Sequence, residues 1–443
     1  MTTRKIRMLN RFMTLWKHAQ HLVRLVGWGV ADQALSSLTN FAVGIYIARS
    51  LATEDFGAFS LAFATYVLAL NASRGLATDP LVVRYSGADV TSWRRAVAKS
   101  TGVAITVGLV AGACCVVVGL LLAGSTRTAF VALGMTLPGL LLQDSWRHAF
   151  FSARKGGQAF GNDVVWALSL LPLLAVVAAT EQSGVFWFVM AWGGSATLAA
   201  FVGGIQARLV PRLSGVAGWL VQHWELAPRY LAENLSLSGA SQLRLYGLGW
   251  IAGMAAVGGL RAAELLLGPL NVLILGIGLI AVPEAARLVR RSARRLGRFC
   301  LLLSSVQAGV ALIWGMALLL LPEALGVRLL GLSWQPASKL LLPVTITVAG
   351  NGFWVAALTG LRALGAAPRS LRAQGYSSAI YLVGALGGAA VAGAAGAAWG
   401  SAAATLVAAF LWWWQLNRGL REFQLPAEPG GRVDTAHLPD TGA

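Results

Sequence analysis

The sequence predicts an all-α polytopic membrane protein of about 12 transmembrane helices in two pseudo-symmetric six-helix lobes, with both termini in the cytoplasm. Three observations support this fold class. Hydrophobic residues make up 57% of the chain and charged residues 12%, with a mean hydropathy of +0.67, far from a soluble globular protein. Most apolar stretches are long enough to cross a bilayer. Most of the 35 Lys and Arg residues lie before the first stretch, in every second gap and at the C-terminus, and positive loops face the cytoplasm.

Twelve apolar spans follow one another along the chain. Loop charge supports this number independently, because a misplaced span would disturb the alternation of basic and nearly uncharged gaps. The predicted spans are Leu25–Ala48, Phe56–Pro80, Ala96–Gly124, Ala129–Phe151, Val164–Thr180, Val185–Gln206, Tyr230–Val257, Ala262–Val282, Phe299–Leu321, Ala337–Leu361, Ser377–Ala394 and Ala397–Trp414.

The longest gap divides the spans into six and six, which predicts five regions. Residues 1–24 form a basic, partly apolar segment that suits the cytoplasmic interface. Residues 25–206 are the N-lobe and residues 230–418 the C-lobe. Residues 207–229 form a cytoplasmic surface connector between them. Residues 419–443 form a cytoplasmic tail that we expect to be disordered, because it is rich in Pro and Gly.

A weak internal repeat relates the two lobes. Ala31-Asp32-Gln33 lies 201 residues before Ala232-Glu233-Asn234, and Gly57 lies the same distance before Gly258. Six spans per lobe is an even number, so both copies start on the same side of the membrane. Such parallel repeats are related by an axis along the membrane normal and place a binding site between the lobes, as in several transporter folds.

Four of the charged residues within the spans are the most informative: Asp32, Arg74, Glu233 and Arg244. At 1.5 Å per residue, Asp32 lies about 12 Å and Arg74 about 15 Å from the cytoplasmic end of its helix. These depths are similar, so the two residues could form an ion pair. Arg244 lies about 22 Å from the start of its helix, on nearly the same face as Glu233. Charged groups at such depths are costly unless they are paired or hydrated.

Two interpretations of these residues stay open. In the first, Asp32 and Arg74 form a structural ion pair that locks two helices together. In the second, Arg74 and Arg244 line a water-filled cavity between the lobes and hold an anionic group, because a planar guanidinium donates two parallel hydrogen bonds to phosphate. Asp32 and Glu233 would then compensate charge in the empty site, or couple transport to H⁺ or Na⁺. Further cavity candidates are Asn40, Asn71 and Asn271.

Other charged residues have simpler explanations. Asp144 precedes Arg147 by three residues and His148 by four, so we expect local pairing along one helix. Arg261 and Glu264 are expected at the outer rim of the eighth span, in contact with solvent.

Catalytic and metal-binding motifs are missing from the sequence. It contains no P-loop, HExxH motif or CxxC pair, so we expect no enzyme activity, no cofactor and no metal. The formal charge of +18 is explained by topology and by attraction to anionic membrane lipids rather than by nucleic acid. Nothing in the sequence requires an oligomer.

Several short motifs resemble one family of membrane proteins, the Wzx-like polysaccharide transporter branch of the MOP flippase superfamily. The similarity covers roughly residues 27–418. The motifs are Asn40-Phe41, Ile47-Ala48-Arg49-Ser50-Leu51, Glu54-Asp55-Phe56-Gly57-Ala58-Phe59-Ser60-Leu61, the Arg147, Phe151, Ala153 and Lys155 positions before Asn162-Asp163-Val164-Val165-Trp166, and Gly396-Ala397-Ala398-Trp399-Gly400-Ser401-Ala402.

This resemblance implies two lobes in a V that move a lipid-linked oligosaccharide across the bacterial cytoplasmic membrane by alternating access. The polyprenyl-pyrophosphate of such a substrate would give Arg74 and Arg244 an anionic partner. Surface polysaccharide biosynthesis, for O-antigen or exopolysaccharide, would make a polymerase and glycosyltransferases functional partners. Two alternatives stay open: a MATE-like cation-coupled drug antiporter, and a non-transporting scaffold for polysaccharide assembly.

Overall fold

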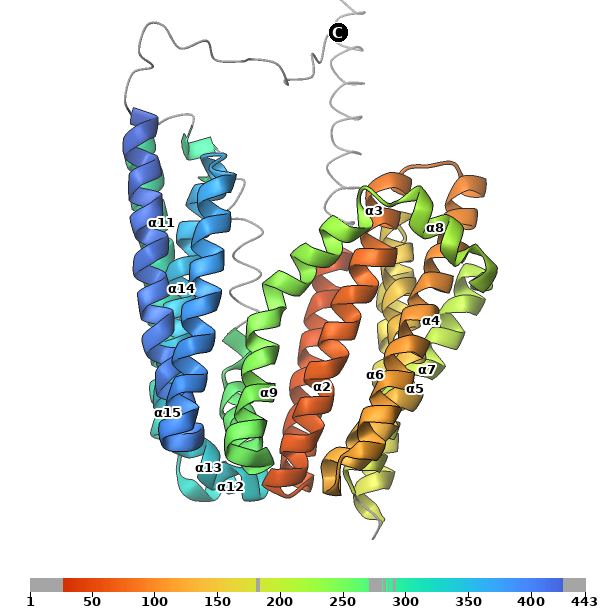
Figure 1. Ribbon diagram of the computed structural model, residues 1–443, viewed down its shortest axis with the longest axis horizontal. Helices are drawn as coiled ribbons and strands as arrows, with labels where there is room; N and C mark the ends of the chain where they lie inside the picture. Colours follow the sequence, from red (N-terminus) through yellow and green to blue (C-terminus); the bar gives the residue numbers. More distant parts are fainter. Residues whose placement is uncertain are drawn as a thin grey trace, which may run out of the picture.

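The computed structural model describes residues 27–180, 184–270, 281, 284–285, 287–289 and 292–424, and these residues are almost entirely helical. The predicted basic segment 1–24, most of the tail and the candidate Asn271 lie outside the described residues. Nine helical stretches of the described part are long and apolar enough to cross a membrane. The predicted class of all-α polytopic membrane protein is confirmed (Figure 1).

The N-lobe begins with a helix over residues 27–50. A second helix is continuous through three segments, α2, the π-helix η1 and α3. The bounds in this lobe are α2 Thr53–Ser73, η1 Arg74–Thr78, α3 Asp79–Tyr85, α4 Val90–Leu121, α5 Gly124–Ser152, α6 Gly156–Ala179 and α7 Val185–Ala207. Asp89 caps α4, since its carboxylate accepts backbone N–H bonds from Thr91 and Ser92 at 3.0 Å.

The connector between the lobes consists mostly of exposed or half-buried residues, with a few buried side chains. It contains η2 (Leu213–Gly215) and α8 (Val216–Gln222). Trp219 is fully buried, and its indole Nε1 donates a hydrogen bond to the Leu76 carbonyl at 3.0 Å. A π-helix leaves such carbonyls without regular partners, so the connector satisfies a backbone group of η1.

The C-lobe contains two helices that fold back on themselves. The bounds are α9 Ala227–Leu266, α11 Ala293–Leu319, α12 Glu323–Leu330, η3 Gly331–Ser333, α13 Trp334–Ser338, α14 Leu341–Ala363 and α15 Ala367–Gln424. α15 breaks at Ala392 and Gly393, close to the predicted gap. Its halves then pack through backbone contacts between Gly384 and Gly400, so it consists of two antiparallel helices.

The predicted boundary between the seventh and eighth spans is wrong. We placed it at residues 258–261, whereas the break in α9 lies at Gly253, whose φ of 82° is open mainly to glycine. The eighth helix therefore starts near Met254. Arg261 and Glu264 consequently lie two to three turns inside it instead of at a solvated rim.

α9 joins the lobes along a seam with α2. In Figure 1, α11, α14 and α15 stand on one side, α2 to α7 on the other, and α9 crosses between them beside α2. We call the end near α8 the connector end and the opposite end the far end. From the connector end to the far end, the contacting pairs are Asp79–Asn234, Asn71–Ser238, Thr65–Tyr246 and Gly57–Gly258.

Candidate functional site

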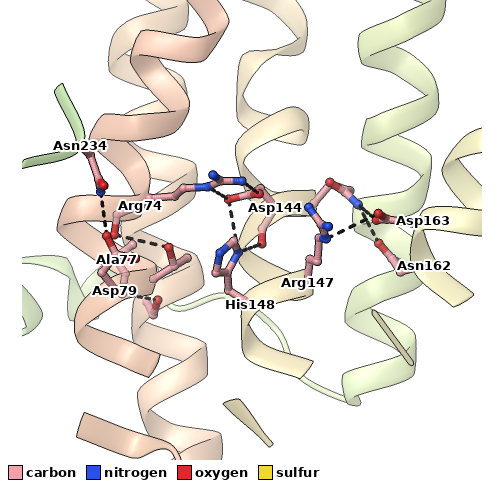
Figure 2. A network of polar contacts seen from close by, with 12 residues as sticks. Arg74, Ala77, Asp79, Asp144, Arg147, His148, Asn162, Asp163 and Asn234 are labelled. Carbon is pink, nitrogen blue, oxygen red and sulfur yellow. Dashed lines mark hydrogen bonds and ion pairs between the residues drawn. The ribbon is translucent and has the colours of Figure 1, made fainter. Parts of the chain in front are cut away.

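The N-lobe holds a network of buried charges that begins at the π-helix. Arg74, the first residue of η1, binds Asp144 of α5 in a bidentate manner, with Nε to Oδ2 at 3.0 Å and Nη2 to Oδ1 at 2.7 Å (Figure 2). The Arg74 side chain is 31% exposed and that of Asp144 only 7%. The buried carboxylate of Asp144 thus fixes the guanidinium of Arg74, part of which remains accessible.

The predicted pairing of Asp32 with Arg74 is wrong. Asp32 is completely buried and binds Arg147 of α5 instead, with Nε to Oδ2 at 2.6 Å. Arg147 also faces Asp163 of α6, with Nε to Oδ2 at 3.5 Å. Gln143 supports Asp163 by donating a hydrogen bond at 2.8 Å. One guanidinium is therefore shared by two carboxylates from different helices.

Local pairing around Asp144 is only partly as predicted. His148, one turn later on α5, lies with Nδ1 3.0 Å from the Asp144 carbonyl and 3.6 Å from its carboxylate. Arg147 points the other way, toward Asp163, as Figure 2 shows. Asp144 therefore has Arg74 as its strong partner, and α5 presents charged groups in two directions.

Carboxylates outnumber guanidiniums in this network. Three aspartates, Asp32, Asp144 and Asp163, face the two arginines Arg74 and Arg147. Oδ1 of Asp32 is buried and lacks a hydrogen-bond partner among the described residues. A buried carboxylate that is incompletely paired is costly. Uptake of a proton or a small cation would remove this excess of negative charge.

The C-lobe has the opposite imbalance. Glu264 binds Arg244 through Oε1 and Arg261 through Oε2, the latter at 3.0 Å. Arg244 and Glu264 lie on the two arms of α9, so their pair closes the turn at Gly253. The Arg244 guanidinium also stacks on Tyr381, 5.6 Å from the ring centre. Two guanidiniums thus share one carboxylate, which leaves an excess positive charge.

Two other predicted site residues have roles outside these clusters. Glu233 is exposed and takes no part in them, although it shares a helix with Arg244. Asn71 donates to Ser238 Oγ at 2.6 Å and so belongs to the α2–α9 seam. The predicted pair of Arg74 and Arg244 is also divided, because each arginine has its own carboxylate in its own cluster.

A small cavity of about 70 Å³, partly open to solvent, lies between the lobes at their far end. Asn40, a predicted cavity residue, is exposed and lines it. Half of the N-lobe residues around the cavity are aromatic, and the C-lobe contributes Arg261 and Leu265. The lining residues are Asn40, Val43, Gly44, Phe56, Phe59, Ser60, Phe63, Trp192, Arg261 and Leu265.

Metal ligation is not a feature of the part of the chain that the structure describes. No group of three or more His, Cys, Asp or Glu side chains is placed there to hold an ion. The N-lobe aspartates are instead occupied by arginines.

Comparisons with known proteins identify the fold. No protein-family model matches the chain, and no curated protein matches it either. The solved structure of the lipid II flippase MurJ in an inward closed conformation is similar, with a TM-score of 0.69 at 9% identity over 90% of each chain. The inward-facing conformation of a multidrug resistance MATE family transporter of the MOP superfamily has a TM-score of 0.67 at 16% identity, covering 89% of this chain and 96% of that chain.

An outward-facing MATE family transporter of the same superfamily is less similar. Its TM-score is 0.55 at 17% identity, over 91% of this chain and 96% of that chain. At these identities the likeness shows the fold alone: the chain has the MATE/MOP transporter fold. The similar structures are transporters and a flippase rather than enzymes.

Proposed function

We propose that this chain is a flippase that moves a polyprenyl-pyrophosphate-linked oligosaccharide across the bacterial cytoplasmic membrane by alternating access of its lobes. One observation carries the proposal. In one ion pair of each lobe, the arginine is more exposed than its carboxylate: 31% against 7% for Arg74 and Asp144, and 32% against 21% for Arg261 and Glu264. The accessible charge is therefore cationic, which suits an anionic cargo.

Arg74 is the best candidate to contact the pyrophosphate. Asp144 occupies its Nε and Nη2, while Nη1 has no partner among the described residues. The bidentate pair fixes the guanidinium plane, so little entropy is lost when phosphate oxygens bind the remaining N–H groups. Arg244 is a poorer candidate than we expected from the sequence, because its side chain is only 5% exposed.

The acidic excess of the N-lobe suggests how transport is driven. Asp32 and Asp163 share Arg147, so a proton or Na⁺ that binds there would neutralise the surplus carboxylate. Entry of an anionic head group near Arg74 would bring negative charge toward the same network. Binding of the cation and of the anion would then favour each other. This keeps Asp32 as a coupling residue and adds Asp163.

The main rival function is a MATE-like drug antiporter, which the aromatic lining of the cavity favours. Such a transporter would need an acidic surface for cationic drugs, whereas Asp144 and Asp32 lie behind their arginines. A scaffold that only recruits glycosyltransferases or a polymerase is the second rival. It would need no buried charges within the lobes, where they are costly.

The test is flipping in reconstituted vesicles. The protein, as a monomer, is reconstituted into vesicles that contain undecaprenyl pyrophosphate carrying a fluorescent disaccharide. Dithionite added outside the vesicles then reduces the probe in the outer leaflet. We expect rapid flipping by the native chain, and a loss of at least about tenfold for Arg74→Gln, the size of one charged hydrogen bond. Arg328→Gln, on exposed α12, should leave flipping unchanged. A native chain that moves fluorescent cationic drugs but not this lipid would overturn the proposal.

A further inference from the structure

The connector between the lobes presents an apolar stripe on the side that faces away from the protein. Leu213, Ala217, Val221 and Trp224 follow one another at spacings of four, four and three residues, so they share one side of η2 and α8. All four are exposed, Leu213 at 53%, Val221 at 80% and Trp224 at 74%. The buried Trp219 lies on the opposite side. We call the four exposed residues the connector stripe.

A helix side that faces water normally carries polar residues, so the connector stripe requires another environment. We propose that the connector is a membrane-interface anchor. Its stripe inserts into the leaflet at the connector end, and the arginines beside it bind the phosphate groups of anionic lipids. Loop charge predicts that this leaflet is the cytoplasmic one. The anchor is independent of the cargo, so it goes beyond the proposed function.

The connector lies along the sides of the N-lobe helices rather than across their ends. The Arg212 N–H donates to the Ala98 carbonyl at 2.7 Å, and Ala98 lies eight residues, or about 12 Å, inside α4. Further along, the Gln222 carbonyl accepts a hydrogen bond at 3.0 Å from Arg84, in the last turn of α3. Beside α4, α8 therefore rises from the depth of the first apolar turns to the helix ends (Figure 1).

This depth is the one at which interfacial helices lie. Their apolar side is buried about 5–10 Å into the boundary between head groups and acyl chains, and their polar side stays outside. The connector stripe crosses that zone, because Leu213 follows the deepest contact and Trp224 follows the shallowest. Tryptophan is enriched at this level of the bilayer, where its ring is apolar and its N–H reaches water or head groups.

The charges beside the connector stripe suit an anionic lipid. Residues 207–229 contain three arginines, Arg208, Arg212 and Arg229, and all three are exposed. Glu225 is the acidic residue of this segment, and it lies 3.9 Å from a further arginine, Arg84. The segment is therefore positively charged on both sides of the stripe along the chain. A phosphate group matches the planar fork of donors that an arginine presents.

Other occupants of the connector stripe are less well suited. Residues 1–24 carry six Lys and Arg residues and no acidic residue, so the arginines of the connector would repel this segment. A soluble partner would have to displace lipid to reach Leu213, which follows the deepest contact of the connector with α4. Charge and depth together therefore favour the lipid surface.

A fluorescent label on the connector stripe tests its insertion. The label, NBD, is attached to Val221→Cys in the full chain, with the native Cys114, Cys115 and Cys300 replaced by alanine. A second label at Ser86→Cys, exposed in the loop between α3 and α4, is the matched control for water at the same end. The protein is reconstituted into vesicles of phosphatidylcholine, with or without phosphatidylglycerol.

Two quenchers then report where each label lies, a lipid with a nitroxide near the head group and iodide in water. We expect the nitroxide lipid to quench most of the fluorescence at Val221→Cys and little at Ser86→Cys. Iodide should give the opposite result. Trp224→Ala should reduce insertion of the label at Val221→Cys in both lipids, and Trp224→Phe should retain most of it.

Charge variants test the binding of lipid phosphate. In vesicles with phosphatidylglycerol, Arg208→Gln and Arg212→Gln should each lower the ratio of inserted to solvated label about fivefold, the effect of one basic side chain at an anionic surface. In pure phosphatidylcholine neither variant should change the ratio. Arg328→Gln is the matched control, since it removes an exposed arginine at the far end, and it should keep the ratio in both lipids.

The outcomes decide the inference without reference to flipping. Iodide quenching at Val221→Cys as strong as at Ser86→Cys would overturn the anchor. Protection from both quenchers would also overturn it, because another part of the chain, such as residues 1–24, would then cover the stripe. Equal insertion in both lipids, unchanged by Arg208→Gln and Arg212→Gln, would overturn the binding of lipid phosphate. Thermal unfolding checks that the labelled variants fold.

Discussion

Gly57 of α2 and Gly258 of α9 lie in reciprocal backbone contact. A Cβ on Gly57 would overlap the Met254 carbonyl, and a Cβ on Gly258 would overlap the Thr53 carbonyl. Met254 follows Thr53 by 201 residues, as Gly258 follows Gly57. Each lobe therefore makes the same backbone contact with the other lobe. A local two-fold axis passes between the two glycines, and the offset that the sequence suggested is the offset of the structure.

Alanine at either glycine should open the far end. Gly57→Ala or Gly258→Ala forces two backbones apart, which we expect to destabilise the closed contact by about 1–3 kcal/mol. The measurement is the rate at which a membrane-impermeant maleimide labels Ser60→Cys, a cavity position, in intact cells. Labelling should rise in both variants. Gly194→Ala, where a Cβ meets open space, is the control, and equal rates in all three would refute the prediction.

Loss of Glu264 should be far more damaging than loss of Arg261. Glu264→Gln leaves Arg244, 5% exposed, as a buried charge without a carboxylate, which costs about 3–5 kcal/mol. Arg261→Gln leaves the Arg244–Glu264 pair intact, so the loss should stay below about 1 kcal/mol. Thermal unfolding in detergent measures both. A similar loss for both variants would show that Arg244 does not depend on Glu264.

Arg147 should behave as a shared partner. Arg147→Ala leaves Asp32 and Asp163 facing each other without a cation, which should cost about 3–5 kcal/mol. Adding Asp32→Asn to Arg147→Ala should recover part of this loss, because the like charges no longer repel. Unfolding of the two single variants and the double variant gives the coupling energy. Simple additivity would contradict the shared arrangement.

The course of the spans could be predicted from the sequence because apolar length and loop charge are strong, local signals. Gly253 shows where they fail. Residues 247–259 are all small or apolar, so no polar gap marks the turn, and a positive φ at one of several glycines leaves no trace in hydropathy. Because we predicted that turn five residues too late, we also predicted that Arg261 and Glu264 lie at a solvated rim.

The ion pairs could not be predicted for a different reason. Asp144 lies 70 residues from Arg74, and Asp32 lies 115 from Arg147. Several buried charged residues have nearly the same predicted depth in the membrane, so depth alone does not decide which of them form ion pairs. The residues themselves are recognisable, since charge within an apolar span is costly. Their pairing depends on helix rotation, which the π-helix at Arg74 alters.

Docking of the connector should depend on pH through His223. This side chain is buried in the connector between the rings of Trp219 and Tyr85. The ring centres of His223 and Trp219 are 4.0 Å apart. Nδ1, assigned as the protonated nitrogen, donates to the Trp219 carbonyl at 2.9 Å. Burial lowers the pKa of His223 below its usual value, and the positive charges of Arg84 and Lys99 act in the same direction. His223 is therefore neutral when the connector is docked.

A lowered pKa in the docked state means that protons bind the undocked connector more readily. Docking should then be strongest above about pH 6.5, the usual pKa of histidine, and should weaken as the pH falls below it. Hydrogen exchange of residues 213–223, corrected for the intrinsic rate, should be faster at pH 5.5 than at pH 7.5. His223→Gln removes the titrating group, so its corrected exchange should not change between these values. A native connector equally protected at both pH values would show that His223 does not control its docking.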